Sequence, residues 1–275
     1  MSQVIKPAQT VRPSAPARSS GRDPRVVRNV GATLLLLVFI AAWQFLPGLL
    51  KTPSFVIPPL TDVIKALTDP VTFPLYMSNA GTTLSEVLTG LVIGIVIGLF
   101  GAIVLAQFPS AYAIVFPYIV ALESIPKVAL APLFVIWFGF GMPSKVVVVV
   151  LLAFFPVLVN TLHGIRGVDR DQIGLFEANG ASRSQIRIKL LIPAALPSIF
   201  SGLELAVANS MIGAIVAEFV GAQHGLGVMI LQAQARLETA AVFALLIILS
   251  ALGIVLNLIV RIARRKIIFW SPDSK

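Results

Sequence analysis

The chain has 275 residues, of which 57% are hydrophobic and 12% charged, and its mean hydropathy is +0.94. Soluble domains carry about 25% charged residues, so this composition indicates a single membrane domain and excludes an ordinary soluble enzyme. The net charge of +9 would suggest nucleic-acid binding in a soluble chain, but the basic residues here lie mostly outside the apolar segments. No cysteine is present, which excludes disulfides and thiolate metal sites.

The N-terminal segment 1–29 is basic, rich in proline and serine, and free of apolar periodicity. These features predict a disordered cytoplasmic tail. A cleaved signal peptide is the rival interpretation, with residues 32–42 as its apolar region. The apolar run continues to Leu50, which favours a first membrane span instead.

Six apolar segments follow, within a predicted transmembrane domain at residues 30–265. About 20 apolar residues cross a hydrocarbon core of about 30 Å. The third segment is interrupted by prolines, and a polar connector at 51–80 contains a short predicted surface helix with Leu60, Val63, Ile64 and Leu67 on one face. The fold class is therefore all-α and polytopic, with six transmembrane helices. The spans are predicted at about 31–50, 82–106, 111–138, 145–162, 198–220 and 242–262.

The longest interior stretch without a spanning pattern is 165–197, and its helix-capping and helix-breaking residues predict a helical hairpin. Asp169 resembles a helix start, and Ser182 with Gln185 forms an S-x-x-Q capping box for a second helix. Gly180 lies where a left-handed residue would end the first helix.

The second hairpin helix is expected to stop at Pro193. Helical spacing places Ile186 and Leu190 on one face, with Arg183 and Arg187 on a neighbouring face. A capped and charged hairpin of this kind, tethered between two spans, is suited to docking on a cytoplasmic partner.

The distribution of lysine and arginine predicts the orientation. Six of the 21 basic residues lie in 1–28, five in 165–197 and five from Arg261 onward. The positive-inside rule therefore places both termini and the hairpin in the cytoplasm.

The hairpin also resembles the EAA loop of ABC-importer permeases, whose pattern is EAA-x3-G-x9-I-x-LP. Nine residues separate Gly180 from Leu190, and Pro193 closes the pattern in register. The first half departs, because Glu177 and Ala178 lie three residues later than the pattern requires. That shift is about one helical turn, so Glu177 could present its carboxylate near the expected place.

A wider resemblance, from about Ser85 to Gly227, is to the nitrate/sulfonate/taurine-type permease family. It is carried by SEVLTGLVIGIVIG, SIPKVALAPLFVIWFGFG, FFPVLVNTLHGIRGVD, GASR and AEFVGAQHGLG. The resemblance implies an inner-membrane permease homodimer with two ABC ATPase subunits and a periplasmic or lipid-anchored solute-binding protein, in contact with membrane lipid. The implied ATPase-coupling residues are Glu177, Gly180, Ala181, Ser182, Arg183, Ile186, Arg187, Leu190 and Pro193.

Charged residues near or within the spans are candidates for a translocation pathway, because charges at membrane depth are commonly functional. Glu123 and Lys127 flank Pro126 in the interrupted third span and could pair if the helix persisted. Solvation at an interface is the equally weighted alternative. Glu218 is a further candidate, since AEFVGAQHGLG matches the family text.

Glu86 and Glu204 are interpreted as interfacial residues near the ends of spans two and five. Gly90 and Gly94, with Gly98 and Gly101, form a small-residue stripe suited to static helix packing or to a sliding surface.

No P-loop pattern occurs, so ATP hydrolysis, if it powers this protein, must be supplied by another polypeptide. His163 and His224 lack partners at ligand spacing, and no cofactor or metal is expected. The resemblance thus implies a non-enzymatic permease subunit of an ATP-driven ABC importer. It would conduct inward a small solute delivered by a binding protein, either nitrate-, sulfonate- or taurine-like, or a vitamin precursor or aromatic compound. An ion-coupled carrier is the alternative, although no internal repeat is found. A membrane-anchored DNA-binding regulator fits poorly with five other spans, so no nucleic-acid partner is expected.

Overall fold

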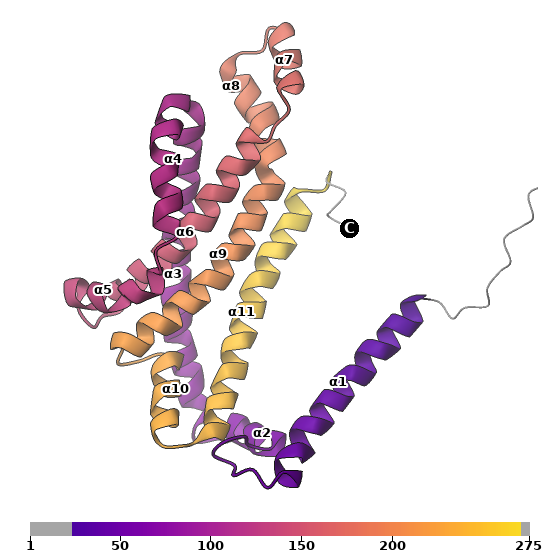
Figure 1. The fold of residues 1–275 in the computed structure, drawn as a ribbon, viewed down its shortest axis with the longest axis vertical. Coiled ribbons are helices and arrows are strands. Elements are labelled where there is room, and N and C mark those ends of the chain that lie inside the picture. Colours follow the sequence, from indigo (N-terminus) through magenta and orange to yellow (C-terminus); the bar gives the residue numbers. More distant parts are fainter. Residues whose placement is uncertain (1–23, 271–275) are drawn as a thin grey trace, which may run out of the picture.

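The computed structural model describes residues 24–270, which form helices and no strands. Figure 1 shows long helices running between two ends of the molecule. The elements are α1 (Pro24–Leu49), α2 (Leu60–Thr68), α3 (Phe73–Gln107), α4 (Pro109–Glu123), the 3-10 helix η1 (Lys127–Leu130), α5 (Ala131–Phe138), α6 (Met142–Arg166), α7 (Arg170–Ala178), α8 (Arg183–Ile186), the π-helix η2 (Arg187–Leu191), α9 (Ile192–Gly221), α10 (Leu226–Ala235) and α11 (Thr239–Ile267).

Five stretches among residues 24–270 are long and apolar enough to cross a membrane as single helices. A sixth is the bent pair of α4 with η1 and α5, whose axes differ by 80°. The bend falls at Pro126, where the missing backbone N–H ends regular helix, as the prolines in this span predicted. Figure 1 shows α5 projecting sideways from the other helices.

The predicted range 82–106 lies within α3, but α3 starts nine residues earlier, at Phe73. Pro74 stands at the first turn, where its fixed φ suits a helix start, so the predicted polar connector ends sooner than expected. The short helix predicted from Leu60 to Leu67 is α2, and its Val63 side chain is fully buried.

The core of the chain is formed where α3 and α9 pack against α6. A Cβ atom added at Gly90 would lie 2.5 Å from Val149 Cβ, and one added at Gly94 would lie 2.7 Å from Ala153 Cβ. These distances are shorter than carbon atoms allow, so glycine is what lets α3 approach α6 this closely. The glycine stripe therefore packs helices, where lipid supplies no hydrophobic drive for association.

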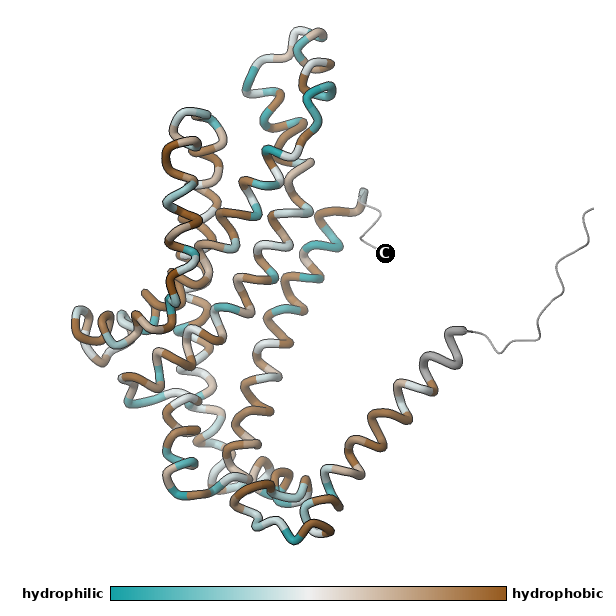
Figure 2. The backbone as a smooth tube through the Cα atoms, viewed as in Figure 1, coloured by the Kyte–Doolittle hydropathy of each residue, from teal (hydrophilic) through white to brown (hydrophobic). Residues whose placement is uncertain are grey.

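The first span, α1, diverges from the other helices and touches them only near its end (Figure 1). There Trp43 Nε1 donates a 3.2 Å hydrogen bond to the carbonyl oxygen of Pro58, which precedes α2. Within the apolar span of α1 only 6% of the residues are buried. Figure 2 shows apolar residues along most of this helix, so α1 has a long apolar surface that this chain leaves uncovered.

The helix directions bring two basic segments of the chain to the same end of the molecule. The C-terminal ends of α3, α6 and α11 lie toward the end that carries the α7–α8 hairpin, while α2 and α10 lie at the other end (Figure 1). The basic residues of 165–197 and the basic residues of the α11 terminus are therefore on one side.

Candidate functional site

The hairpin predicted at 165–197 is present as α7 and α8, with the predicted caps. The Asp169 carboxylate accepts a 3.0 Å hydrogen bond from the Asp171 backbone N–H at the start of α7. Ser182 and Gln185 form a reciprocal capping box, with bonds of 2.8 and 3.3 Å. Gly180 has φ of +75°, the left-handed conformation that glycine adopts without strain. The local predictions of both helix starts and of the turn are confirmed.

The predicted stop at Pro193 is wrong. Helix α8 continues through the π-turn η2 into α9, so residues 183–221 form one continuous helical stretch. Proline lacks the N–H that would bond four residues back. The chain winds wider immediately before it, and Ile192 N–H bonds to the Arg187 carbonyl oxygen, five residues back. The second arm of the hairpin is thereby joined directly to a membrane span.

The side chains of the hairpin divide into an inner and an outer set. Ile186 is buried at 6% exposure, and Leu190 is half-buried. Leu175 and Ile188 are instead the apolar side chains that face outward, at 63% and 64% exposure. Sequence periodicity found the face of Ile186 and Leu190 but could not tell that it packs inward.

A hollow of about 420 Å³ lies between the two arms of the hairpin. It includes the outward Leu175 and the Gly180 turn, together with Lys189 at its edge. Ala181 also lines it. This hollow offers a partner protein a concave surface with both apolar and basic side chains.

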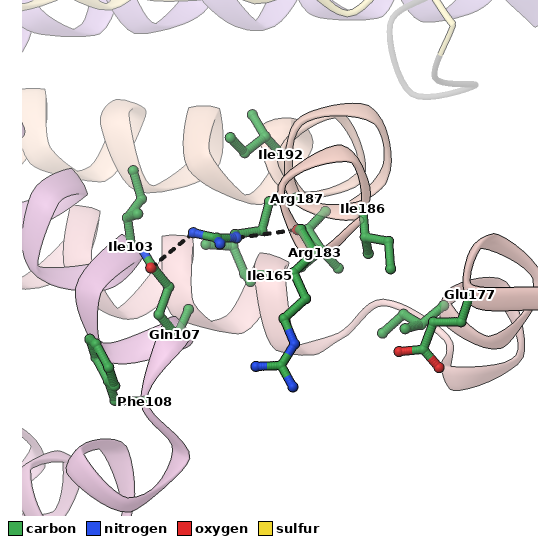
Figure 3. Close-up of a pocket in the computed structure, with 12 residues that line it drawn as sticks. Ile103, Gln107, Phe108, Ile165, Glu177, Arg183, Ile186, Arg187 and Ile192 are labelled. Atoms are coloured by element: carbon green, nitrogen blue, oxygen red, sulfur yellow. Dashed lines mark hydrogen bonds between the residues drawn. The ribbon is translucent and has the colours of Figure 1, made fainter. Parts of the chain in front are cut away.

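A second pocket, of about 370 Å³, separates the hairpin from the end of α3 (Figure 3). Arg187 crosses it: Nη1 donates a 2.9 Å hydrogen bond to Gln107 Oε1, and Nε donates to the Arg183 carbonyl oxygen. Glu177 is exposed at its margin. The predicted arginine face therefore includes one side chain that is tied back to the membrane domain.

The break in the third span places Glu123, Pro126 and Lys127 at a junction of helices. Lys127 Nζ donates a 2.8 Å hydrogen bond to the Glu123 carbonyl oxygen and lies 4.6 Å from the centre of the Phe155 ring. Within residues 24–270 no ion pair joins the two side chains, because α4 ends at Glu123 and the helical i,i+4 geometry is lost. The Glu123 side chain is exposed at the break.

Glu218 lies at the end of α9 and is buried, at 1% exposure. Its Oε1 accepts a 2.6 Å hydrogen bond from Thr83 Oγ1 of α3, and its Oε2 accepts from the Gly227 backbone N–H of α10. Thr83 Oγ1 in turn accepts a 2.9 Å bond from Leu226 N–H, while Asn79 Oδ1 accepts a 2.7 Å bond from Gly225 N–H. Together these hydrogen-bonded residues form what we call the Glu218 network, which joins α3 and α9 to the start of α10: Asn79, Thr83, Glu218, Gly225, Leu226 and Gly227.

Two further charged residues lie buried near this network. Glu86 is 3% exposed, and its Oε2 is buried without a hydrogen-bond partner in the described residues. Lys145 is 2% exposed and donates to the carbonyl oxygens of Phe140 and Gly141 before α6. The interfacial interpretation of Glu86 is therefore wrong. Sequence reasoning also overlooked Lys145, whose only signal was a lysine opening an apolar run.

Glu204 differs from Glu86. It forms a 3.3 Å ion pair with Arg264 of α11, and both side chains are 24% exposed. This partly solvated pair links α9 and α11 near the hairpin end of the molecule.

Comparison with known proteins places this arrangement in a family. Residues 90–269 match the family described as binding-protein-dependent transport system inner membrane component. The chain is 35% identical over 222 residues to the formylaminopyrimidine transport permease protein ThiX of Halalkalibacterium halodurans, covering 81% of this chain and 88% of that protein. It is 32% identical over 237 residues to the putative aliphatic sulfonates transport permease protein SsuC of Bacillus subtilis, covering 86% of each.

The taurine transport system permease protein TauC of Escherichia coli is 30% identical over 243 residues, covering 86% of this chain and 88% of that protein. Among solved structures, the crystal structure of an amino acid ABC transporter with histidines aligns with a TM-score of 0.56 at 20% identity, covering 71% of this chain and 94% of that one. The likeness to this solved structure concerns the fold, which is that of a type I ABC permease. The chain belongs to the binding-protein-dependent transport system inner membrane component family and is a multi-pass inner-membrane permease subunit of an ABC importer.

Proposed function

We propose that the α7–α8 hairpin is the surface on which a separate ABC ATPase acts, and that two copies of this chain and two ATPases form the importer. The observation that carries this proposal is the continuity of α8, η2 and α9. A force applied to the hairpin is passed to a membrane span without an intervening flexible loop. ATP-driven closure of two ATPases could then move two such spans as rigid bodies.

The coupling residues take two kinds of role in this proposal. Gly180 and Ser182 shape the turn and cap, and Ile186 with Leu190 holds the arms together from inside. Pro193 follows the π-turn, in the first turn of α9. The ATPase would contact the hollow of about 420 Å³ around Ala181 and the exposed side chains of Leu175 and Ile188. Glu177 and Arg183 lie at the other side of the hairpin, next to the membrane domain.

The proposed orientation has the hairpin and both termini in the cytoplasm. It rests on the basic residues of the hairpin and of the α11 end, which lie on one side of the molecule (Figure 1). The homodimer is proposed from the family resemblance, because lipid would cover the apolar surface of α1 as well as a second copy would. For the pathway we propose Glu123, Pro126 and Lys127 at the bent third span. Glu218, buried in its network, would hold α3, α9 and α10 in place around the pathway.

The proposed cargo is a small organic solute delivered by a solute-binding protein. Relatives of similar length are described as permeases for formylaminopyrimidine, aliphatic sulfonates, taurine and riboflavin. These names span anionic sulfonates and heterocyclic vitamin compounds, so the proposal covers both classes.

Co-purification tests the coupling role. A tagged chain is expressed together with a candidate ABC ATPase subunit, and the ATPase retained in detergent is measured. We expect Leu175→Asp to reduce the retained ATPase by about 10-fold, since an aspartate desolvated against an apolar partner costs at least about 1.4 kcal/mol. Leu237→Asp is the matched control, because Leu237 is 66% exposed at the opposite end of the molecule.

Two results would contradict the proposal. One is the absence of any ATPase with the intact chain, which would leave the hairpin without its proposed partner. The other is equal retention by Leu175→Asp and Leu237→Asp, which would move the contact away from the hairpin.

A further inference from the structure

The pocket between the hairpin and α3 has a wall of apolar side chains on the membrane side. Ile103 and Phe108 come from the end of α3 and the turn after it, and Ile192 comes from the start of α9. They are 39%, 58% and 39% exposed. The long apolar run of α3 ends at Gln107, so the pocket lies where the membrane-embedded surface meets the polar hairpin.

The opposite wall of the pocket carries two guanidinium groups one helical turn apart. Arg187 is held in place by Gln107 Oε1 and by the Arg183 carbonyl oxygen, which use two of its five N–H donors. Arg183 reaches into the same space from α8 (Figure 3). An arginine fixed in this way needs little further ordering to bind an anion, which favours binding.

These two positive charges are not neutralised within the described part of the chain. Glu177 is the acidic residue in the lining, and no ion pair joins it to either arginine within residues 24–270. The pocket thus retains a net positive charge beside an apolar wall.

We propose that this pocket binds an acidic phospholipid of the cytoplasmic leaflet, with Arg183 and Arg187 holding the headgroup phosphate. Its acyl chains would lie along Ile103 and Phe108. A volume of about 370 Å³ accommodates a phosphate with its glycerol. Arginine binds phosphate oxygens through parallel N–H donors, and basic pockets at the cytoplasmic ends of spans are suited to anionic headgroups. An acidic side chain of a partner protein would satisfy the arginines but leave the apolar wall uncovered.

Bound lipid would join the hairpin to α3 at the point where the hydrogen bond from Arg187 to Gln107 now spans the gap. The anionic lipid content of the leaflet would then affect how firmly the hairpin is held. The inference rests on the proposed orientation, because it places the pocket in the cytoplasmic leaflet.

Native mass spectrometry of the purified full-length chain tests the proposal. The chain is titrated in detergent with phosphatidylglycerol and, separately, with phosphatidylethanolamine. The pocket variant is Arg183→Gln with Arg187→Gln. The control variant is Arg170→Gln with Arg265→Gln, which removes the same charge from exposed positions that line neither this pocket nor the hollow between the hairpin arms.

We expect phosphatidylglycerol to bind the intact chain and the control variant with similar affinity, and the pocket variant roughly 10-fold or more weakly. Phosphatidylethanolamine should bind all three chains weakly. Equal binding of the two lipids by the intact chain, or equal phosphatidylglycerol binding by the two variants, would overturn the proposal. Thermal unfolding of each variant establishes that folding is retained. Gln107→Leu frees Arg187 without removing charge, and it should give an intermediate loss of phosphatidylglycerol affinity.

ATPase co-purification on the same samples separates this inference from the proposed function. If the pocket variant keeps phosphatidylglycerol but loses the ATPase, the arginines bind the partner protein and the lipid proposal fails. If no chain retains ATPase while the pocket variant alone loses phosphatidylglycerol, the lipid site stands and the coupling role fails.

Discussion

The hydroxyl of Thr83 and the carboxylate of Glu218, 135 residues apart, share a buried hydrogen bond of 2.6 Å. Thr83 belongs to α3 and Glu218 to α9, and the turn into α10 folds back over the carboxylate. A Cβ atom at Gly225, where φ is +124°, would overlap the Glu218 carboxylate. The turn is therefore built around the side chain at its centre.

Gly225→Ala should accordingly destabilise the chain. The added methyl group would displace the carboxylate from Thr83, and alanine would be strained at this φ. We expect a loss of about 2 kcal/mol or more, seen as a lower unfolding temperature in detergent. Gly174→Ala is the matched control, because a Cβ there meets no atom within 4 Å and the residue is helical. An unfolding temperature for Gly225→Ala equal to that of the control would contradict this description of the turn.

The close approach of α3 to α6 gives a second prediction. Gly94→Ala places a methyl group against Ala153 Cβ, so the two helices must separate and stability should fall by about 1 to 3 kcal/mol. Adding Ala153→Gly removes the opposing methyl group and should restore part of the loss, as a thermal unfolding series would reveal. The Val150 carbonyl oxygen, 3.0 Å from the new Cβ, prevents complete recovery. Independent, additive effects of the two substitutions would show that the helices do not meet at this point.

How much of this could be read from the sequence depends on the range of the interactions. The caps of the hairpin were predictable because Asp169, Ser182 and Gln185 act on backbone groups two or three residues away. The wrong stop at Pro193 shows the limit of such rules. A proline does not always end a helix: Pro156 and Pro197 lie inside α6 and α9, and Pro193 follows the π-turn η2 in the first turn of α9.

The burial of charged side chains was not predictable for a related reason. Glu86 and Glu218 stand near the ends of apolar segments, where solvation is the usual outcome. Their burial depends on α10 and on the turn before α6, which cover them from distant parts of the chain. Ile186 likewise has the spacing of a docking face, yet the end of α3 and the start of α9 lie around it. Periodicity identifies an apolar face but not what covers it.

Lys145 gives a third prediction through the two carbonyl groups that it holds. Lys145→Met removes the donor to the carbonyl oxygens of Phe140 and Gly141 at a buried position, so stability should fall by about 2 kcal/mol. A double-mutant cycle with Glu86→Gln measures the coupling between these two buried side chains, and the second substitution should recover part of that loss. The double-mutant cycle is measured by unfolding in detergent. A coupling energy near zero would mean that the two side chains act independently.

The capping box of α8 gives the last prediction, which links local stability to coupling. Ser182→Ala removes the hydroxyl that accepts from Gln185 N–H at 3.3 Å, and we expect α8 to lose about 1 kcal/mol. Hydrogen exchange of the α8 amides should quicken by about fivefold, while α9 amides beyond Phe200 stay protected. Ser184→Ala, at an exposed position of the same helix, controls for the loss of a hydroxyl. Because α8 passes force to α9 in the proposed importer, ATPase-driven uptake should fall with Ser182→Ala and not with Ser184→Ala. Unchanged exchange in Ser182→Ala would mean that tertiary packing, chiefly through buried Ile186, holds α8 without its cap.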